Sequence, residues 1–557
     1  MSRWSALHVH LHGGPDQADA LLRDHVVPAT AASLDRGEIS SWFFVRYWEG
    51  GPHLRWRVAD ASPATAHRLR AGLVEAVAAL PPPAREPRPA DWYARFGVAA
   101  TDDLGWHPHG TVLAEPYEPE TDRYGGPEAI AAAEDLFAAS SRVAATVLGA
   151  APARRRSTAV DLLFAFVTAS GFSGHAAAGF LRGYANGWAA TPAADGAGLA
   201  EAVTTAERDF HARPAAFVER QRQVAGIVAG RTGAGTSVGF WADAVAGYVA
   251  RLRELAGQGR LTAPVPAILA SQIHMLHNRL GLSIPAECQL AWLASATYAR
   301  PVPPPDLHAD GPDARDRAYH EGSKFVRPLW PAQRPRAAAA PGPAGAAPAA
   351  EVLPLPAATA GPLGTTTLAD ALLARRTRGD LGSEAVDAAQ LSRLLRYAAG
   401  TTGDARLAYP TAGGLASARL TVLPRRTDGV PPALYRYLPE RHALHRVAPD
   451  PGPDRLARVA PQFDPAAPAG IDAAAVALWL FVVVDLTRSR AKYGSRAYRF
   501  AAVETGHLAQ NLLLATTALG LRATPVGGFF DDYLDHLLLL DGVSTLSSYV
   551  LAVGSGD

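Results

Sequence analysis

The chain has 557 residues, more than one hydrophobic core normally supports, so we expect at least two domains. Its 53 basic and 52 acidic side chains nearly cancel, which argues against a general binder of nucleic acid or of an acidic membrane surface. The single cysteine, Cys288, excludes an internal disulfide and a multi-cysteine metal site. We therefore expect no bound metal. The sequence contains no signal-peptide core and no apolar run long enough to span a membrane, so we also expect a cytoplasmic protein.

Residues 1 to about 300 alternate strand-like and helical stretches. The run from Trp42 to Trp56 predicts a hairpin, and Arg55 and Arg57 alternate along its second strand, so both should share one face. Residues 66–80 then show a helical pattern. This part therefore predicts a mixed α/β domain.

The middle of the chain changes composition twice. It becomes proline-rich at Pro301, and from about Pro331 to Gly364 it is dominated by Ala, Pro and Gly, which cannot bury a core. A short aromatic segment, Tyr319 to Phe325, lies between these stretches. We therefore expect a first domain at 1–300, a leading segment of the second domain at 301–330, a flexible loop at 331–364 and the second domain at 365–557.

The last part predicts a compact α+β unit. Two amphipathic helices are expected at Leu368–Ala374 and Ala388–Ala399, the second with Asp387 and Gln390 as a capping box and Gly400 past its end. Strands are expected at 419–423, 434–437, 475–484 and 548–553, and a long helix at 498–519.

Lysine is nearly absent from the chain. Lys324 and Lys492 are the only two, and arginine supplies the other basic side chains. A genomic base composition that favours arginine codons would replace lysine wherever a charge suffices and leave it where an amine must lose its proton. Both positions are therefore candidate sites, with chance survival as the alternative.

Three stretches of the second domain have the composition of a flavin site. Arg375 to Arg378 supply guanidinium groups suited to a phosphate. Tyr409 to Leu415 combines hydroxyls with glycines that let the main chain approach a flat ring, and Val526 to Phe529 is a glycine-rich loop. Each stretch alone more often marks a solvated helix end or a turn.

The order of the motifs is more specific than any one of them. Arg-Arg-Thr, Tyr-Pro-Thr-Ala-Gly, the run from Lys492 to Phe500 and the run from Glu504 to Asn511 follow one another. In this order they resemble the SagB-type azoline dehydrogenases, which are nitroreductase-like FMN enzymes. The resemblance covers about residues 310–557, because Tyr319 to Lys324 also looks like that family's first motif. It implies a central mixed sheet flanked by helices, and a homodimer with FMN at the subunit interface.

The resemblance also implies a reaction and its residues. Lys492 and Tyr493 would be the catalytic pair that removes a proton while a hydride passes to the flavin, and the sequence leaves open which of them is the base. The alternative is a lysine that merely lies beside a packed tyrosine. The residues that would hold FMN are Arg375, Thr377, Arg378, Thr411, Gly413, Gln510, Asn511, Gly527 and Gly528.

A second resemblance covers residues 1–300. The hairpin with its arginines, the run from Tyr117 to Gly126 and the run from His274 to Leu280 together resemble the thiopeptide-type bacteriocin biosynthesis domain. That domain is related to the glutamate-eliminating C-terminal domain of lantibiotic dehydratases and to pyridine-forming enzymes. We favour peptide binding over an independent elimination here, with structural pairing of the arginines as a further alternative. The residues that would engage the peptide are Arg46, Arg55, Arg57, Arg123, His274 and His277.

Together these patterns predict FMN-dependent oxidation of thiazolines or oxazolines to thiazoles or oxazoles in a ribosomally synthesised, thiopeptide-like peptide. Oxygen would be the electron acceptor. The implied partners are the azoline-bearing precursor peptide, cyclodehydratase proteins and a second copy of the chain. Three alternatives stay open: a flavin-dependent reductase of dehydroamino acids, an N-terminal eliminase or cycloaddition enzyme, and a peptide-binding scaffold. The sequence does not reveal which peptide or which ring is preferred.

Overall fold

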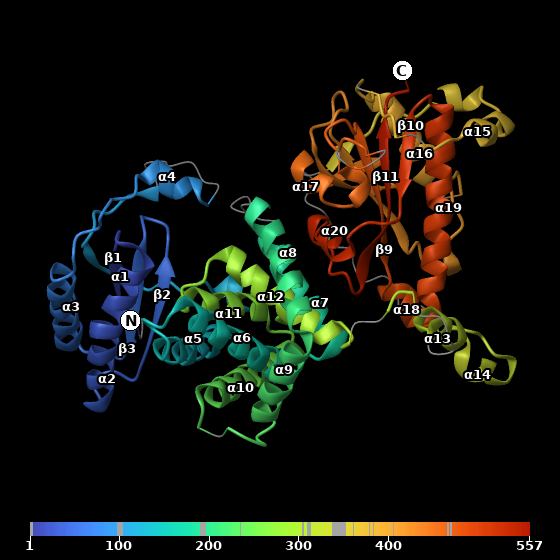
Figure 1. Ribbon diagram of the computed structural model, residues 1–557. Coiled ribbons are helices and arrows are strands. Elements are labelled where there is room, and N and C mark those ends of the chain that lie inside the picture. Colours follow the sequence, from blue (N-terminus) through green and yellow to red (C-terminus); the bar gives the residue numbers. More distant parts are fainter. Residues whose placement is uncertain are drawn as a thin grey trace. The chain divides into compact units, whose positions relative to one another are not determined.

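The chain divides into two compact units, Met1–Pro303 and Pro304–Asp557 (Figure 1). The computed structural model describes residues 4–96, 104–189, 196–233, 235–303, 306–308, 314–336, 352–359, 361–377, 379–382, 384–404, 406–464, 467 and 470–556. None of the helices in these ranges combines the length and the apolar character that a bilayer crossing requires.

The first unit begins with a four-stranded antiparallel sheet whose two faces differ. On one face of the third strand, Leu54, Trp56 and Val58 are buried in the apolar core. The alternate residues Arg55 and Arg57 line a cavity on the other face, as the two-residue period of a strand requires. The expected shared face of these arginines is therefore confirmed. The strands are β1 (Trp4–His10), β2 (Ser41–Tyr47), β3 (His53–Ala59) and β4 (Val112–Glu115). They lie side by side in the order β2-β3-β1-β4.

The β2 edge of this sheet is covered by two helices, α5 (Ile130–Ala145) and α11 (Val265–Arg279). The Phe44 N–H donates to Ser141 Oγ at 3.2 Å. Asn278 accepts a hydrogen bond from the Arg46 N–H at 3.0 Å and donates one to its carbonyl at 2.9 Å. These bonds satisfy backbone groups that a sheet edge leaves unpaired, and they fix α11 beside the β2–β3 hairpin.

Helices make up the rest of the first unit. The central one, α12 (Ile284–Ala299), is buried continuously from Glu287 to Thr297 because α6, α7, α8 and α9 pack around it. The others are α1 (Gly14–Leu21), α2 (Val27–Asp35), α3 (Pro63–Ala78), α4 (Pro89–Ala94), α6 (Pro152–Ala169), α7 (Gly174–Ala189), α8 (Gly196–Ala212), α9 (Pro214–Val228) and α10 (Ser237–Gly257).

A seven-stranded sheet forms the centre of the second unit, in the order β10-β11-β9-β6-β7-β8-β5. Its middle strand is buried along Leu478–Val484, which explains why that run is almost wholly apolar. The strands are β5 (Val352–Pro354), β6 (Ala418–Pro424), β7 (Ala433–Leu438), β8 (Ala443–Pro449), β9 (Leu478–Asp485), β10 (Arg522–Val526) and β11 (Thr545–Gly554).

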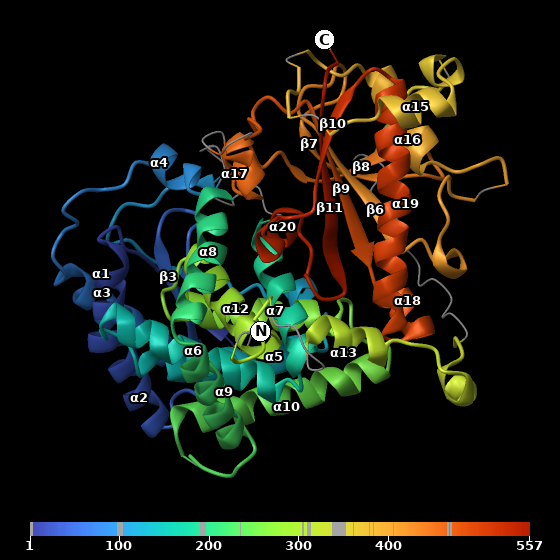
Figure 2. The ribbon, with the colours of Figure 1, turned by 45° about the vertical axis from the view of Figure 1, so that its right-hand side comes forward.

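The long helix α19 (Arg496–Ala518) packs against this sheet and against α16 (Ala388–Ala399), as both ribbon views show (Figures 1 and 2). The capping box at the start of α16 is present, since Asp387 accepts from the Gln390 N–H and Gln390 accepts from the Asp387 N–H. The remaining helices are α13 (Arg315–Gly322), α14 (Trp330–Gln333), α15 (Leu368–Ala374), α17 (Pro453–Ala457), α18 (Thr487–Tyr493) and α20 (Asp531–Leu537).

The predicted α+β class is confirmed, and the predicted elements of the second unit are present. Two details need correction. The described strand pairs of this sheet are antiparallel rather than mixed. One reason is that β6, β7 and β8 follow one another through short turns that reverse the chain. One isolated bridge, Val386–Thr427, is parallel. Within the stretch expected to be a loop, Val352–Pro354 pairs with the exposed edge of β8. Residues 337–351 of that stretch lie outside the described residues.

Candidate functional site

Lys492 and Tyr493 lie at the end of α18, directly before Gly494, whose φ of 59° ends the helix. The Lys492 carbonyl accepts a hydrogen bond from the Arg336 N–H at 3.0 Å. The Tyr493 ring packs edge-on against Phe500 of α19, with 5.1 Å between ring centroids. Both side chains of the pair are half-buried, so they are held in place and still accessible from outside.

The two reactive atoms of this pair meet at Gly413, in the loop that precedes β6. A Cβ atom added to Gly413 would lie 2.2 Å from the Tyr493 hydroxyl oxygen and 2.7 Å from Lys492 Nζ. The Lys492 Nζ also lies 5.2 Å from the centroid of the Tyr493 ring. Gly413 has a φ of 60°, which glycine adopts without strain. The Tyr-Pro-Thr-Ala-Gly motif and the Lys-Tyr pair therefore form one site.

The leading segment packs on the residues that follow the pair. The Tyr319 hydroxyl donates to the Ser495 carbonyl at 3.0 Å, and the Arg496 guanidinium donates to the Ser323 carbonyl at 3.1 Å. The second lysine, Lys324, forms an ion pair with Glu321 on the surface of this segment. Its position therefore suits a solvated side chain, whereas Lys492 has no ion pair within the described residues.

The predicted phosphate-binding residues lie at the other end of the sheet. Gly382, a few residues after Arg375, forms a β-bridge with Ser555, and this bridge lies at the end of the sheet where β9 begins. Lys492 instead follows the residue at which β9 ends. A strand of this length spans roughly 25 Å. Figures 1 and 2 both place α15 and α18 at opposite ends of α19. Arg375 is half-buried and Thr377 is exposed, while Arg378 lies outside the described residues.

The other predicted cofactor residues are spread over the second unit. Thr411 is half-buried in the same loop as Gly413, and Gln510 is exposed on α19. Asn511 donates to the carbonyls of Ala398 and Ala408 at 3.3 and 3.0 Å, so its amide N–H groups tie α19 to α16 and to the strand-like run before the loop. Gly527 and Gly528 follow β10 and are exposed, and a Cβ atom on Gly527 would meet the Tyr549 ring at 3.3 Å.

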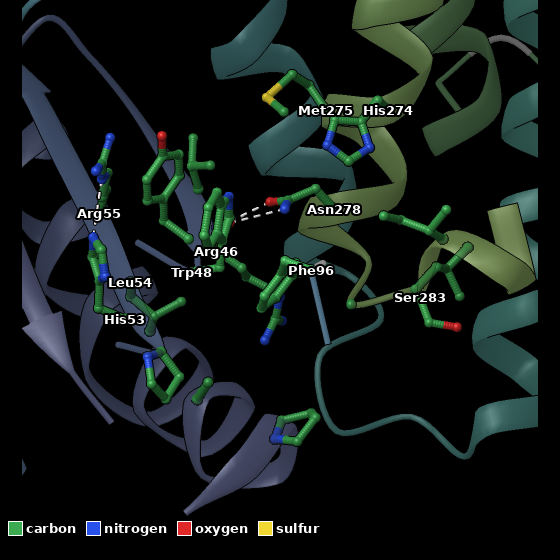
Figure 3. A pocket seen from close by; sticks show the side chains of 18 of the residues that line it. Arg46, Trp48, His53, Leu54, Arg55, Phe96, His274, Met275, Asn278 and Ser283 are labelled. Carbon is green, nitrogen blue, oxygen red and sulfur yellow. Dashed lines mark hydrogen bonds between the residues drawn. The ribbon is translucent and has the colours of Figure 1, made fainter. Parts of the chain in front are cut away.

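The first unit contains a cavity of about 1390 Å³ that collects most of the predicted peptide-binding residues. Figure 3 shows Arg55 on β3 and His274 on α11 on opposite sides of it. Aromatic side chains, including Trp48 and Trp92, complete the walls. A cavity of this size with aromatic walls and a few polar groups is typical of a ligand-binding site. The predicted residues that line it are Arg46, Arg55, Arg57, Arg123 and His274.

Among the described residues, Arg55, Arg57 and Arg279 are arginines at or beside the cavity that form no ion pair with a carboxylate. The Arg55 guanidinium stacks 3.4 Å from the centroid of the Tyr47 ring, and Arg57 lies 4.6 Å from that of Tyr117. Burial lowers the pKa of Arg57 to about 10 and that of Arg279 to about 9. Arg57 Nε and Arg279 Nη2 are both buried without a hydrogen-bond partner. Burying such charges is costly without compensation, so the site favours an anionic ligand.

Arg46 differs from these arginines, because its guanidinium is already paired. It contacts the buried carboxylate of Asp19 at 2.5 Å, and Arg155 contacts the other oxygen of that carboxylate. Arg123 lies 3.5 Å from Glu120 and is partly exposed. The geometry therefore favours a structural role for Arg46, whereas Arg55 and Arg57 form no ion pair within the described residues and can meet a ligand.

The structure separates the two candidate histidines. His274 lines the cavity, and its Nδ1–H donates to the Glu287 carboxylate at 3.1 Å. His277 is fully buried, and its Nδ1 lies 3.7 Å from the same carboxylate. Burial opposes ionisation of Glu287, but the charges and hydrogen bonds of His274 and His277 outweigh it and lower the pKa to about 2. The Tyr184 hydroxyl also donates to Glu287. Sequence reasoning missed Glu287, since no local motif connects it to the histidines.

Histidines also gather on the cavity side of the sheet. His8, His10 and His12 alternate along and just beyond β1, and His53 stands opposite His10 on β3. Burial lowers the pKa values of His8, His10 and His53 to about 3, so these rings are neutral near pH 7. The His-x-His-x-His spacing was the available signal, because alternate strand residues share a face. Within the described ranges, no three His, Cys, Asp or Glu side chains are arranged to hold a metal ion.

Comparisons with known proteins match both units. A family model described as the C-terminal part of the lantibiotic biosynthesis dehydratase matches residues 4–298, and a nitroreductase family model matches residues 372–555. A protein of Methanocaldococcus jannaschii named as a nitroreductase is 31% identical over 174 residues, which cover 31% of this chain and 83% of the relative.

Two solved structures are similar to parts of this chain. The pyridine synthase TbtD from thiomuracin biosynthesis is 23% identical, covers 53% of this chain and 97% of its own, and has a TM-score of 0.42. The E. coli microcin synthetase McbBCD complex is 19% identical, covers 46% of this chain and 100% of the matched chain, and has a TM-score of 0.30.

The fold and the two family matches define a protein that joins a lantibiotic dehydratase-type unit to a nitroreductase-type unit. Through residues 4–298 the chain belongs to the lantibiotic biosynthesis dehydratase C-terminal family, and through residues 372–555 it belongs to the nitroreductase family. The fusion expected from the sequence is thereby confirmed.

Proposed function

We propose that the second unit is an FMN-dependent azoline dehydrogenase that oxidises thiazolines or oxazolines in a ribosomally made peptide. The observation that carries this proposal is the convergence of Lys492 Nζ and the Tyr493 hydroxyl at Gly413, within a nitroreductase-family unit. An amine and a phenol at one point supply a base for proton removal.

The reaction breaks C–H bonds at two adjacent ring carbons and forms a double bond between them. One hydrogen leaves as a proton to Lys492 or Tyr493, and the other leaves as a hydride. When bound, FMN supplies the acceptor for that hydride and passes the electrons to oxygen. Either member of the pair suits the role of base, because an amine nitrogen and a phenol oxygen can each take up a proton.

The residues present suit an FMN group. Gly413 has no side chain, so a flat ring can approach its backbone and the pair beside it. Arg375 has no carboxylate partner within the described residues, which leaves its guanidinium group for a phosphate, whereas Arg376 Nη1 donates to the carbonyls of Leu373 and Arg375. Thr411, in the same loop as Gly413, offers a hydroxyl.

A single chain does not bring both groups of residues to one flavin. The arginines after α15 and the Lys-Tyr pair lie at opposite ends of the sheet, which are separated by roughly the 25 Å length of a strand. We therefore propose that two copies of the chain share each FMN. One copy would hold the phosphate with Arg375, and the other would present Thr411, Gly413 and the Lys-Tyr pair.

We propose further that the cavity of the first unit binds the precursor peptide through a carboxylate. Arg55 and Arg57 line it from β3 and form no ion pair in the described part of the chain, and the buried Arg279 adds positive charge behind them. Charge-assisted hydrogen bonds to these groups would anchor an acidic side chain of the peptide. Peptide binding by this unit would deliver azoline rings to the second unit of the same protein.

Anaerobic mixing tests the proposal. The purified protein should be yellow, and an azoline-bearing peptide should bleach its flavin absorbance in the absence of oxygen. A Lys492→Ala, Tyr493→Phe double variant should keep its colour and bleach far more slowly, whereas the control Lys324→Ala should behave as wild type. A yellow wild-type protein that no azoline peptide reduces would overturn the assignment. Rapid bleaching by NAD(P)H would favour the reductase alternative, and a colourless protein would favour a scaffold.

A further inference from the structure

Glu504 is a buried carboxyl group that the proposed reaction does not use. It lies on α19, one helical turn after the Phe500 that packs on Tyr493, and it is only 2% exposed. Neither carboxylate oxygen makes a hydrogen bond of normal geometry. An unpaired buried carboxyl group costs free energy, so its presence needs an explanation.

The groups that Glu504 faces belong to the loop that carries Gly413. The carboxyl group lies close enough to the backbone N–H groups of Ser417 and Ala418 and to the Ser417 hydroxyl for them to lower its pKa, although none meets it at hydrogen-bonding geometry. The carbonyls of these two residues are occupied elsewhere. Ser417 accepts from the Asp485 N–H at 2.9 Å, and Ala418 accepts from the Tyr409 hydroxyl at 2.8 Å. Their N–H groups are therefore the part of the loop end that Glu504 can hold.

This loop needs an anchor because its backbone is strained. Gly413, Gly414 and Ala416 all have positive φ, at 60°, 69° and 52°. Alanine in that region costs about 1 kcal/mol and persists only where the surroundings impose it. A loop so bent would relax if its end were released, and Gly413 would move away from the Lys-Tyr pair.

We propose that Glu504 is a positioning residue, which holds the Tyr409–Ala418 loop to α19 through the Ser417 and Ala418 N–H groups and so sets Gly413 against Lys492 and Tyr493. The inference deepens the proposed function, since it concerns the same site. Tyr493 is then fixed from two sides, by Phe500 on α19 and by Gly413 on the loop.

The charge of Glu504 should control how firmly the loop is held. Burial raises the pKa of Glu504 to about 7, and the interactions with Ser417 and Ala418 offset only part of this shift. The ionised form is the stronger acceptor for N–H groups. Tyr409 is the neighbouring loop group whose charge couples to Glu504, and Arg419 and Glu440 couple to Tyr409 in turn. Burial keeps Tyr409 protonated, so near neutral pH the change in this cluster comes from Glu504.

Lysine acetylation provides a test that uses neither flavin nor peptide. The chain has only two lysines, so mass spectrometry can follow acetylation of Lys492 with Lys324 as an internal reference in the same molecule. In the wild type, the Lys492:Lys324 rate ratio should fall as pH rises through about 7, because the ionised carboxylate tightens the loop. The Glu504→Gln variant should give a flat ratio, higher by about fivefold at pH 8, the change expected when one charge-dependent interaction with the loop N–H groups is lost.

The exposed Glu384 supplies the matched control, and Glu384→Gln should reproduce the wild-type profile. Glu504→Asp keeps the charge, so it should retain a pH-dependent ratio even if Glu504→Gln does not fold. A flat wild-type ratio between pH 6 and 8, or the same pH dependence in Glu504→Gln, would overturn the inference. Because no azoline is oxidised in this experiment, its failure would leave the proposed function standing. Equally, failure of the azoline oxidation test would leave the role of Glu504 in the loop standing.

Discussion

Adding one methyl group at Gly413 should disable the site. In Gly413→Ala the new Cβ would lie 2.2 Å from the Tyr493 hydroxyl oxygen and 2.7 Å from Lys492 Nζ. Carbon and oxygen need more than 3 Å between them, so the pair or the loop must shift by about 1 Å. A shift of that size lowers the rate by about 10²-fold. We expect such a loss in turnover of an azoline peptide, measured by mass spectrometry.

Gly414→Ala is the matched control for this variant. Gly414 has nearly the same φ, 69° against 60°, but a Cβ atom there would meet nothing within 4 Å. Both substitutions should therefore destabilise the folded backbone by a similar amount, about 1 kcal/mol, which lowers the melting temperature by about 2–4 °C. Only Gly413→Ala should lose activity. Equal turnover in the two variants would refute the assignment of the site to the contact between Gly413 and the Lys-Tyr pair.

Three further predictions concern the catalytic pair and the first unit. The Lys492→Ala, Tyr493→Phe double variant should lower azoline turnover by about 10²-fold or more at unchanged flavin content, measured by peptide mass spectrometry and visible absorbance; full turnover would contradict the role of the pair. Arg57→Gln should weaken precursor binding by about tenfold, measured by fluorescence anisotropy. Arg46→Gln should instead lower the melting temperature, because it leaves the buried Asp19 carboxylate with fewer partners. The opposite pattern would argue against the division of roles between these arginines. The folded state lowers the pKa of Glu287 from 4.5 to about 2, so its contribution to stability is present above about pH 4.5 and is lost as pH falls toward 2. Urea unfolding should show a larger stability difference between wild type and Glu287→Gln at pH 7 than at pH 3, and equal differences would count against an ionised Glu287.

Local rules predicted much of the second unit. The bounds of α15 and α16 follow from apolar spacing and from the capping box at Asp387 and Gln390, both of which depend on neighbouring residues. The continuous apolar run of β9 predicted a strand buried on both faces. Antiparallel pairing was not predictable in the same way, because apolar content does not define strand direction.

The candidate sites depended on contacts between distant parts of the chain. Motif order predicted the Lys492-Tyr493 pair and Gly413 as site residues, but their meeting at one point results from the packing of α18 beside the loop before β6. In the first unit, alternation along β3 predicted the shared face of Arg55 and Arg57. The same reasoning gave no sign that Arg46 pairs with Asp19 or that Glu287 joins His274 to His277, since those partners come from other helices.

The central claim is the removal of two hydrogens from an azoline ring by a flavin and the Lys492-Tyr493 pair. Its most direct test is mass spectrometry of an azoline-bearing peptide after incubation in air with the FMN-loaded protein. The account predicts a loss of about 2 mass units for each ring oxidised, one proton and one hydride, and no loss with the double variant. An unchanged peptide mass alongside a fully flavin-loaded protein would contradict it.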